Sequence, residues 1–246
     1  MTPPALDRLS AAALQQALDA LARYTAGSPR GPLLPLDDAV AQATTDPASA
    51  RELQTRLLSL LHPDTPPEAR EYICRQLILI GTAPAVPALA AFLNDPAVAH
   101  AARGTLEVLP DPAAGQALRD AIPRLTGLLR VGAITSLGRR RETASVALLA
   151  SLLRDSDEPT ATAAVAALGD IASPEAGAAL RAFLPHAPAV LRPVLADACL
   201  ACAERLPAAE HRDLARELYA WCQGEAQPRH VQSAAAAGLA RLAPAG

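Results

Sequence analysis

Lysine is absent from the 246-residue sequence, so all 22 cationic side chains are arginines. They are balanced by 25 aspartates and glutamates, which gives a formal net charge of −3 at pH 7. General nucleic-acid binders usually carry a net basic face that neutralises phosphates, whereas the densest basic run here, Arg139-Arg140-Arg141, is short. We therefore expect no nucleic-acid partner.

Aromatic residues are also scarce. They make up 2% of the sequence although 51% of its residues are hydrophobic, and the apolar excess is alanine and leucine. These two are the strongest apolar helix formers, whereas the β-branched residues that favour strands are sparse. The composition predicts a helical protein whose helices approach closely and which has few large rings to shape a deep cofactor pocket.

Long apolar runs are missing as well. No stretch of about 18 apolar residues is free of charge and proline, so we expect no membrane partner. Residues Met1–Pro4 do not combine a basic stretch with an apolar segment, as a secretory signal would. This pattern predicts a cytoplasmic protein, or an exported one if the chain is a fragment of a longer protein.

Motifs for catalysis and metal binding are absent too. Neither a nucleotide-binding glycine motif nor H-E-x-x-H nor G-x-S-x-G occurs. Cys199 and Cys202 have C-x-x-C spacing, but no second pair completes a zinc set, and both lie in an apolar stretch. The acidic run Asp155–Glu158 lacks the glycine and distal glutamate of an EF-hand. We expect structural thiols, a solvated acidic loop, and no catalytic residue, metal or cofactor.

An apolar segment recurs about every 30 residues, as in solenoids built from helical hairpins. One set of copies superposes on a shared leucine, which is Leu57, Leu89, Leu118, Leu148, Leu180 and, loosely, Leu214. A second set alternates with it and comprises Cys74–Gly81, Ala133–Gly138 and Ala163–Gly169. Each repeat is therefore predicted to be two short helices, with the second set forming the A helices and the leucine set the B helices.

Proline and glycine mark the expected helix ends. Ser173-Pro174-Glu175 combines an N-cap hydroxyl, a first-turn proline and a first-turn acid, which favours a helix start. Gly81, Gly138 and Gly169 are predicted to end A helices in the left-handed conformation.

A turn-rich segment, Ala26–Pro32, follows a predicted helix around Asp7–Tyr24. We therefore predict an N-terminal helix and linker over residues 1–31 and a solenoid over residues 32–246.

The pattern A-x-x-A-L-G-x-I-x-x-P-E-A-x-x-A-L over Ala164–Leu180 resembles the short HEAT repeat that is also found in phycobilin lyases. Ile73–Leu93, His100–Leu137 and Asp197–Leu206 resemble HEAT modules within long proteins of Planctomycetes and Verrucomicrobia. The resemblance implies an all-α fold, a right-handed α-α superhelix (a HEAT-like, armadillo-like solenoid) of about six helical hairpins. Its motifs specify a scaffold and carry over no catalytic residue.

The B helices of HEAT arrays typically line the concave side. The predicted partner-binding residues are the polar positions of these helices and the arginine turn, namely Arg119, Asp120, Arg139, Arg140, Arg141, Arg154 and Arg181. The predicted function is a non-catalytic protein-binding or assembly scaffold for a protein partner, such as an acidic peptide or a domain of a larger complex. The alternative is an enzyme-associated module that holds a chromophore or sugar in the concave face, as in bilin lyases.

Overall fold

The computed structural model describes residues 11–206 and 208–242. Within these ranges all regular structure is helical, with fourteen α-helices, several short 3-10 turns and no strand. The predicted all-α, HEAT-like solenoid is confirmed.

The chain divides into two compact units, Met1–Ala121 and Ile122–Gly246, called here the N-terminal and C-terminal units. The N-terminal unit contains α1 (Ala11–Leu21), α2 (Leu34–Ala43), α3 (Pro47–Leu60), α4 (Pro67–Ile80), α5 (Val86–Ala91), α6 (Ala99–Val108) and α7 (Pro112–Ala121). The C-terminal unit contains α8 (Gly127–Arg139), α9 (Val146–Leu152), α10 (Glu158–Ile171), α11 (Pro174–Phe183), α12 (Arg192–Arg205), α13 (Ala208–Cys222) and α14 (Arg229–Leu242). The domain boundary predicted after residue 31 stays a prediction.

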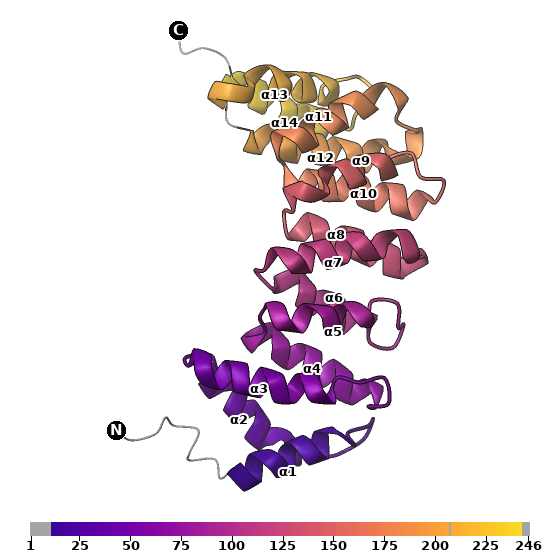
Figure 1. The fold of residues 1–246 in the computed structure, drawn as a ribbon. Coiled ribbons are helices and arrows are strands. Elements are labelled where there is room, and N and C mark those ends of the chain that lie inside the picture. Colours follow the sequence, from indigo (N-terminus) through magenta and orange to yellow (C-terminus); the bar gives the residue numbers. More distant parts are fainter. Residues whose placement is uncertain (1–10, 207, 243–246) are drawn as a thin grey trace. The chain divides into compact units, whose positions relative to one another are not determined.

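Within each unit, A helices pack on A helices and B helices on B helices (Figure 1). In the N-terminal unit α4 lies between α2 and α6, and α5 lies on α7. In the C-terminal unit α10 lies between α8 and α12, while α11 lies between α9 and α13. The two alternating helix sets expected from the sequence are therefore the two layers of each unit.

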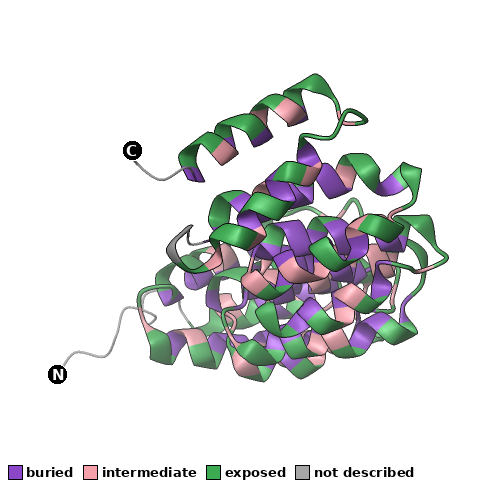
Figure 2. Cartoon of the chain, turned by 90° about the horizontal axis from the view of Figure 1, so that it is seen from above, coloured by how far each residue is buried: buried purple, intermediate pink, exposed green. Residues whose placement is uncertain are grey.

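The shared leucines form the core between the layers, and Figure 2 shows buried residues gathered on the helix sides that face other helices. Four of the six predicted positions are fully buried, namely Leu57, Leu89, Leu118 and Leu180. Leu148 and Leu214 are only half-buried.

The predicted register was wrong in α9 and α13. The buried residues there are Leu149 and Leu218. The pair Leu148-Leu149 offers two leucines, and only Leu149 keeps the spacing to the buried Val146 that Leu89 keeps to Val86. On a helix this three-residue spacing decides which leucine faces the core.

The expected left-handed glycine caps are also wrong. Gly81 ends α4 in an extended conformation, and Gly138 and Gly169 lie inside α8 and α10. The left-handed residues that follow these two helices are Arg141, with φ 50°, and Ala172, with φ 49°.

The physical requirement for Gly138 and Gly169 is close helix packing. A Cβ atom on Gly138 would lie 2.7 Å from Ala167 Cα, and one on Gly169 would lie 2.7 Å from Ala198 Cα. The missing side chains therefore let α8, α10 and α12 approach at backbone distance.

The helix start predicted at Ser173-Pro174-Glu175 is confirmed. Ser173 Oγ accepts a hydrogen bond from the Ala176 N–H (3.2 Å), and Pro174 is the first residue of α11. Asp46 caps α3 in the same way, through the N–H groups of Ala48 and Ser49. Helix α1 falls within the predicted Asp7–Tyr24 range, of which residues 7–10 lie outside the described part of the chain.

Candidate functional site

Arg119 and Asp120 lie on the surface of α7, where both contact Gln116. Arg119 Nη2 donates to Gln116 Oε1 (2.7 Å), and Gln116 Nε2 donates to Asp120 Oδ1 (2.6 Å). These three side chains form a polar row within one helix of the N-terminal unit.

Arg181 projects from α11 toward the next B helix, α13. Its Nη1 forms an ion pair with Glu217 Oε2 at 3.3 Å, and about half of each side chain is exposed. An exposed pair of this kind contributes only about 0–1 kcal/mol, so both groups can exchange it for another partner.

Arg154 is a predicted residue that lines a hollow. This hollow has a volume of about 430 Å³ and its floor includes the buried side chains of Leu153, Phe183 and Leu191. A second hollow, of about 350 Å³, lies between α9 and α11 and also borders Ser151. Both hollows are lined by Leu153, Arg154 and Phe183. We call the two together the α9–α11 hollows.

The rim of the larger hollow carries charges of both signs. Arg154, His186 and Glu158 are exposed around it. Asp155 also borders it, but its Oδ2 forms an ion pair with Arg130 Nη2 at 2.9 Å. At the opening, Arg154 and His186 therefore lie near two acids, of which Asp155 is paired with Arg130 and Glu158 is exposed.

In the acidic loop that begins at Asp155, two aspartate carboxylates accept hydrogen bonds from backbone N–H groups. Asp155 Oδ1 accepts from the Asp157 N–H (2.9 Å), and Asp157 caps α10 through the Thr160 N–H (3.1 Å). In residues 11–206 and 208–242 no group of three or more histidine, cysteine, aspartate or glutamate side chains is placed to hold a metal ion.

The three consecutive arginines do not act as one group. Arg140 caps the end of α8 and its Nε donates to Glu142 Oε2 (3.4 Å), with only 8% of the arginine side chain exposed. Arg139 and Arg141 instead line a third hollow of about 300 Å³, together with Gly138, Asp170 and Arg205. Sequence reasoning missed Arg205; stacking of the A helices, which brings their C-terminal ends together, is the signal that points to it.

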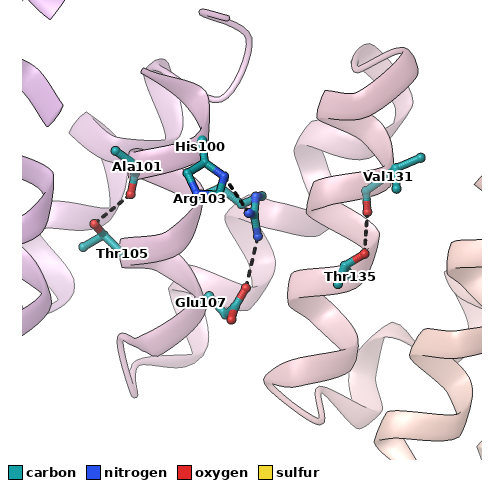
Figure 3. Close-up of polar contacts among 7 residues, drawn as sticks. All are labelled: His100, Ala101, Arg103, Thr105, Glu107, Val131 and Thr135. Carbon is teal, nitrogen blue, oxygen red and sulfur yellow. Dashed lines mark hydrogen bonds and ion pairs between the residues drawn. The ribbon is translucent and has the colours of Figure 1, made fainter. Parts of the chain in front are cut away.

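His100 belongs to a polar row on α6 (Figure 3). Arg103 contacts His100 Nδ1 (3.1 Å) and donates to Glu107 Oε2 (3.1 Å). On the same helix, Thr105 Oγ1 donates to the carbonyls of Ala101 (3.0 Å) and Cys74 (2.8 Å), so it joins α6 to α4. In the C-terminal unit Thr135 makes the same type of bond within α8, to the Val131 carbonyl at 2.9 Å.

The four cysteines are buried, unpaired thiols. Cys202 Sγ lies 3.6 Å from the Leu168 carbonyl and Cys222 Sγ 3.7 Å from the Ala196 carbonyl. Burial raises the pKa of Cys202 to about 12 and that of Cys74 to about 12. The thiols of Cys74 and Cys202 are therefore protonated at neutral pH. Cys199 and Cys202 are both fully buried, which confirms their interpretation as small core residues.

None of the described helices is long and apolar enough to cross a lipid bilayer.

Part of the C-terminal unit matches a known protein family. Residues 126–199 match the family model of HEAT repeats. This segment includes Gly138, Gly169 and the whole of the pattern over Ala164–Leu180 that resembled a short HEAT repeat. Among curated proteins, no sequence matches this chain significantly.

Two solved structures share the helical architecture. Human deoxyhypusine hydroxylase, in complex with glycerol, is 17% identical with a TM-score of 0.39, over 81% of this chain and 97% of that one. The complex of CpcE and CpcF of phycocyanin lyase from a Nostoc species is 18% identical with a TM-score of 0.40, over 93% of this chain and 94% of that one.

Proposed function

We propose that this protein is a non-catalytic protein-binding or assembly scaffold whose C-terminal unit holds a segment of a partner protein in the α9–α11 hollows. The observation that carries the proposal is the buried apolar floor, Leu153 and Phe183, shared by two adjoining hollows with the exposed Arg154 between them. An apolar anchor in a pocket beside a charged rim is the arrangement that dominates binding energy at protein interfaces.

The chemistry of the hollows favours a particular kind of segment. Val190 leaves 56% of its surface exposed at the edge of the larger hollow, so an apolar side chain of the partner would cover it. Arg154 would bind a neighbouring carboxylate through its planar fork of donors. The expected partner segment therefore combines one bulky apolar residue with a nearby acid.

One further predicted contact of the C-terminal unit, Arg181, extends this surface. Arg181 is exposed on α11, and its pair with Glu217 is weak enough to yield to a partner carboxylate. Arg119 and Asp120 stay predicted contacts of the N-terminal unit. Reversing Arg119 and Arg181 together to glutamate is expected to weaken an acidic partner at least about tenfold, or about 1.4 kcal/mol.

The test uses a random peptide library displayed on phage and selected against the intact chain. Selected peptides should carry an apolar residue beside an acid, and Arg154→Glu and Val190→Asp should each weaken them at least about tenfold. Both side chains are exposed, so neither change should affect folding. Arg212→Glu, an exposed arginine of α13 outside the hollows, is the matched control.

Peptides that bind the Arg154→Glu, Val190→Asp and native proteins equally would move the interface away from these hollows. Loss of binding in the Arg212→Glu control as well would show a general charge effect instead.

An enzyme-associated role is the second candidate, and one observation favours it. A volume of about 430 Å³ lies within the range of about 300–1,000 Å³ that small-molecule sites occupy. A chromophore or sugar that co-purifies with the native protein, and is lost in the Val190→Asp variant, would support this role over the scaffold.

A further inference from the structure

The smaller of the α9–α11 hollows has walls of short side chains. The lining residues that it does not share with the larger hollow lie on two neighbouring B helices, namely Ala150 and Ser151 of α9 and Ala179 and Ala182 of α11. The Ser151 hydroxyl already donates to the Leu148 carbonyl within its own helix (2.7 Å). The walls therefore present mainly methyl groups, which suit an apolar side chain.

The larger hollow is apolar at its floor and charged at its rim. Leu191 adds to the buried floor, and Val190 is exposed at the edge. Asp155, Glu158 and His186 line this hollow but not the smaller one. Each hollow can thus take one apolar side chain, and the two differ in the charges around them.

Arg154 lies at the boundary of the two hollows. The other residues that line both are Leu153 and Phe183, so Arg154 is the charged residue that the two described linings share. Arg154 is exposed, and within residues 11–206 and 208–242 its side chain makes no ion pair or hydrogen bond. A carboxylate is the group that complements such a guanidinium. The surface therefore consists of an apolar hollow, a cation and a second apolar hollow.

We propose, resting on the function proposed above, that the partner segment is an amphipathic helix with an apolar residue, an acid and a second apolar residue in one row. The two apolar residues would each enter one hollow, and the acid would bind Arg154. Positions i, i+4 and i+7 share one side of a helix.

The length of the row favours a helix over an extended segment. Positions i to i+7 of an α-helix span about 10 Å. An extended segment would need positions i, i+2 and i+4 for the same row, over about 13 Å. The shorter row fits better because the hollows adjoin at a single arginine.

The experiment selects helix-forming, alanine-based peptides displayed on phage against the intact chain, with only positions i, i+4 and i+7 randomised. The native protein should enrich apolar residues at i and i+7 together with aspartate or glutamate at i+4. Enrichment of an acid with only one apolar position, or of no peptide at all, would overturn the two-anchor helix. The fully random library described above tests the proposed function separately, so the two failures are distinguishable.

Each part of the row has its own variant. Ala182→Leu fills the smaller hollow from an exposed position of α11 that suits leucine, so the apolar preference should be lost at one end of the row only. Ser151→Leu fills the same hollow from α9 and should have the same effect. Val190→Asp should remove the preference at the opposite end. With Arg154→Glu, the enrichment of acids over arginine and lysine at i+4 should fall at least about tenfold.

Ala220→Leu is the matched control for Ala182→Leu, because it makes the same change at an exposed position of α13 outside both hollows. Its selected peptides should match those of the native chain, and circular dichroism follows the folding of every variant. An unchanged selection by Ala182→Leu and Ser151→Leu would overturn the proposal. So would loss of the same end position in Ala182→Leu and Val190→Asp, or a change in the control as large as that in Ala182→Leu.

Discussion

The two units stack similar hairpins with different chemistry. In the N-terminal unit, polar side chains join one helix to the next. Asp37 on α2 accepts hydrogen bonds from Tyr72 (2.5 Å) and Gln76 (3.2 Å) on α4. Gln54 Oε1 on α3 accepts hydrogen bonds from the N–H group and the hydroxyl of Thr82. Arg70 on α4 forms an ion pair with Asp95 at 2.6 Å. These bonds are directional, so they favour one register of the hairpins.

In the C-terminal unit, small residues make the closest A-helix contacts, and hydrogen bonds from α12 to α10 run from Arg205 and Cys202 to backbone carbonyls. Gly138 lies against Ala167, and Gly169 against Ala198, at distances that leave no room for a methyl group. Cys199 and Cys202 fill the same layer as buried thiols. Register is set here by shape, because only a glycine faces the neighbouring backbone at each contact. The HEAT family match over residues 126–199 covers both glycines.

The largest expected effect tests the shape-based packing of the C-terminal unit. Gly138→Ala combined with Gly169→Ala should destabilise the protein by about 4 kcal/mol, because each new Cβ overlaps a backbone atom of the next helix. Urea unfolding followed by circular dichroism measures the change. Gly104→Ala on α6 is the control; space is open there, so the better helix propensity of alanine should stabilise the protein by about 0.5–1 kcal/mol. Stabilisation by both sets of changes would show that the glycines are not needed for close approach.

The next effect concerns the buried leucine that occurs in a B helix of each unit. Leu89→Ala in α5 and Leu149→Ala in α9 should each cost about 3 kcal/mol, because both side chains are fully buried. Leu148→Ala, one residue away and half-buried, should cost less than about 1 kcal/mol. The three free energies of unfolding compare directly. A larger loss at Leu148 than at Leu149 would restore the register first predicted from the sequence.

The repeat period and the composition of the sequence were sufficient to predict the hairpins and most of the buried leucines. The reason is that the spacing of apolar residues on a helix determines which side is buried. A double leucine such as Leu148-Leu149 satisfies two registers, and the choice needs the neighbouring hairpin. The role of Gly138 was mistaken because a glycine near a helix end has the same local pattern whether it caps the helix or receives another helix.

The candidate sites were less predictable than the fold. Arg154 was found as a polar B-helix position, but the hollows beside it depend on Phe183 and Val190, which come from other segments. Arg139, Arg140 and Arg141 looked like one basic run, whereas the chain turns there and directs Arg140 to Glu142. Side chains far apart in sequence meet only through the packing, and no local pattern encodes that.

The third effect tests the polar contacts of the N-terminal unit. Arg70 is 7% exposed, it lies over the ring of Phe92, and its charge is balanced by Asp95. Asp95→Asn keeps an acceptor for the Ala97 N–H but leaves this buried cation unpaired, so it should cost about 2 kcal/mol. Glu52→Gln, which breaks the exposed pair with Arg56 on α3, should cost less than about 0.5 kcal/mol. Urea unfolding of both variants measures the difference, and equal losses would mean that burial adds nothing to the Arg70 pair.

The smallest effect isolates one hydroxyl of the same unit. Burial and the neighbouring Asp37 carboxylate raise the pKa of Tyr72 far above its usual range, so its hydroxyl is a hydrogen-bond donor at neutral pH. Tyr72→Phe removes that donor, but Gln76 and Arg30 still contact Asp37, whose side chain is partly exposed. The loss should therefore be about 1 kcal/mol, below the range for a fully buried bond to a charged group.

Tyr24→Phe is the matched control for this variant. The Tyr24 ring packs against Tyr72, with ring centroids 6.4 Å apart, and its hydroxyl forms no hydrogen bond within the described residues. Its replacement should change the free energy of unfolding by less than about 0.5 kcal/mol. If both variants lose the same amount, the stabilisation at Asp37 comes from ring packing, and the contrast between polar and shape-based stacking is weaker than the distances indicate. A loss confined to Tyr72→Phe assigns it to the bond that joins α4 to α2.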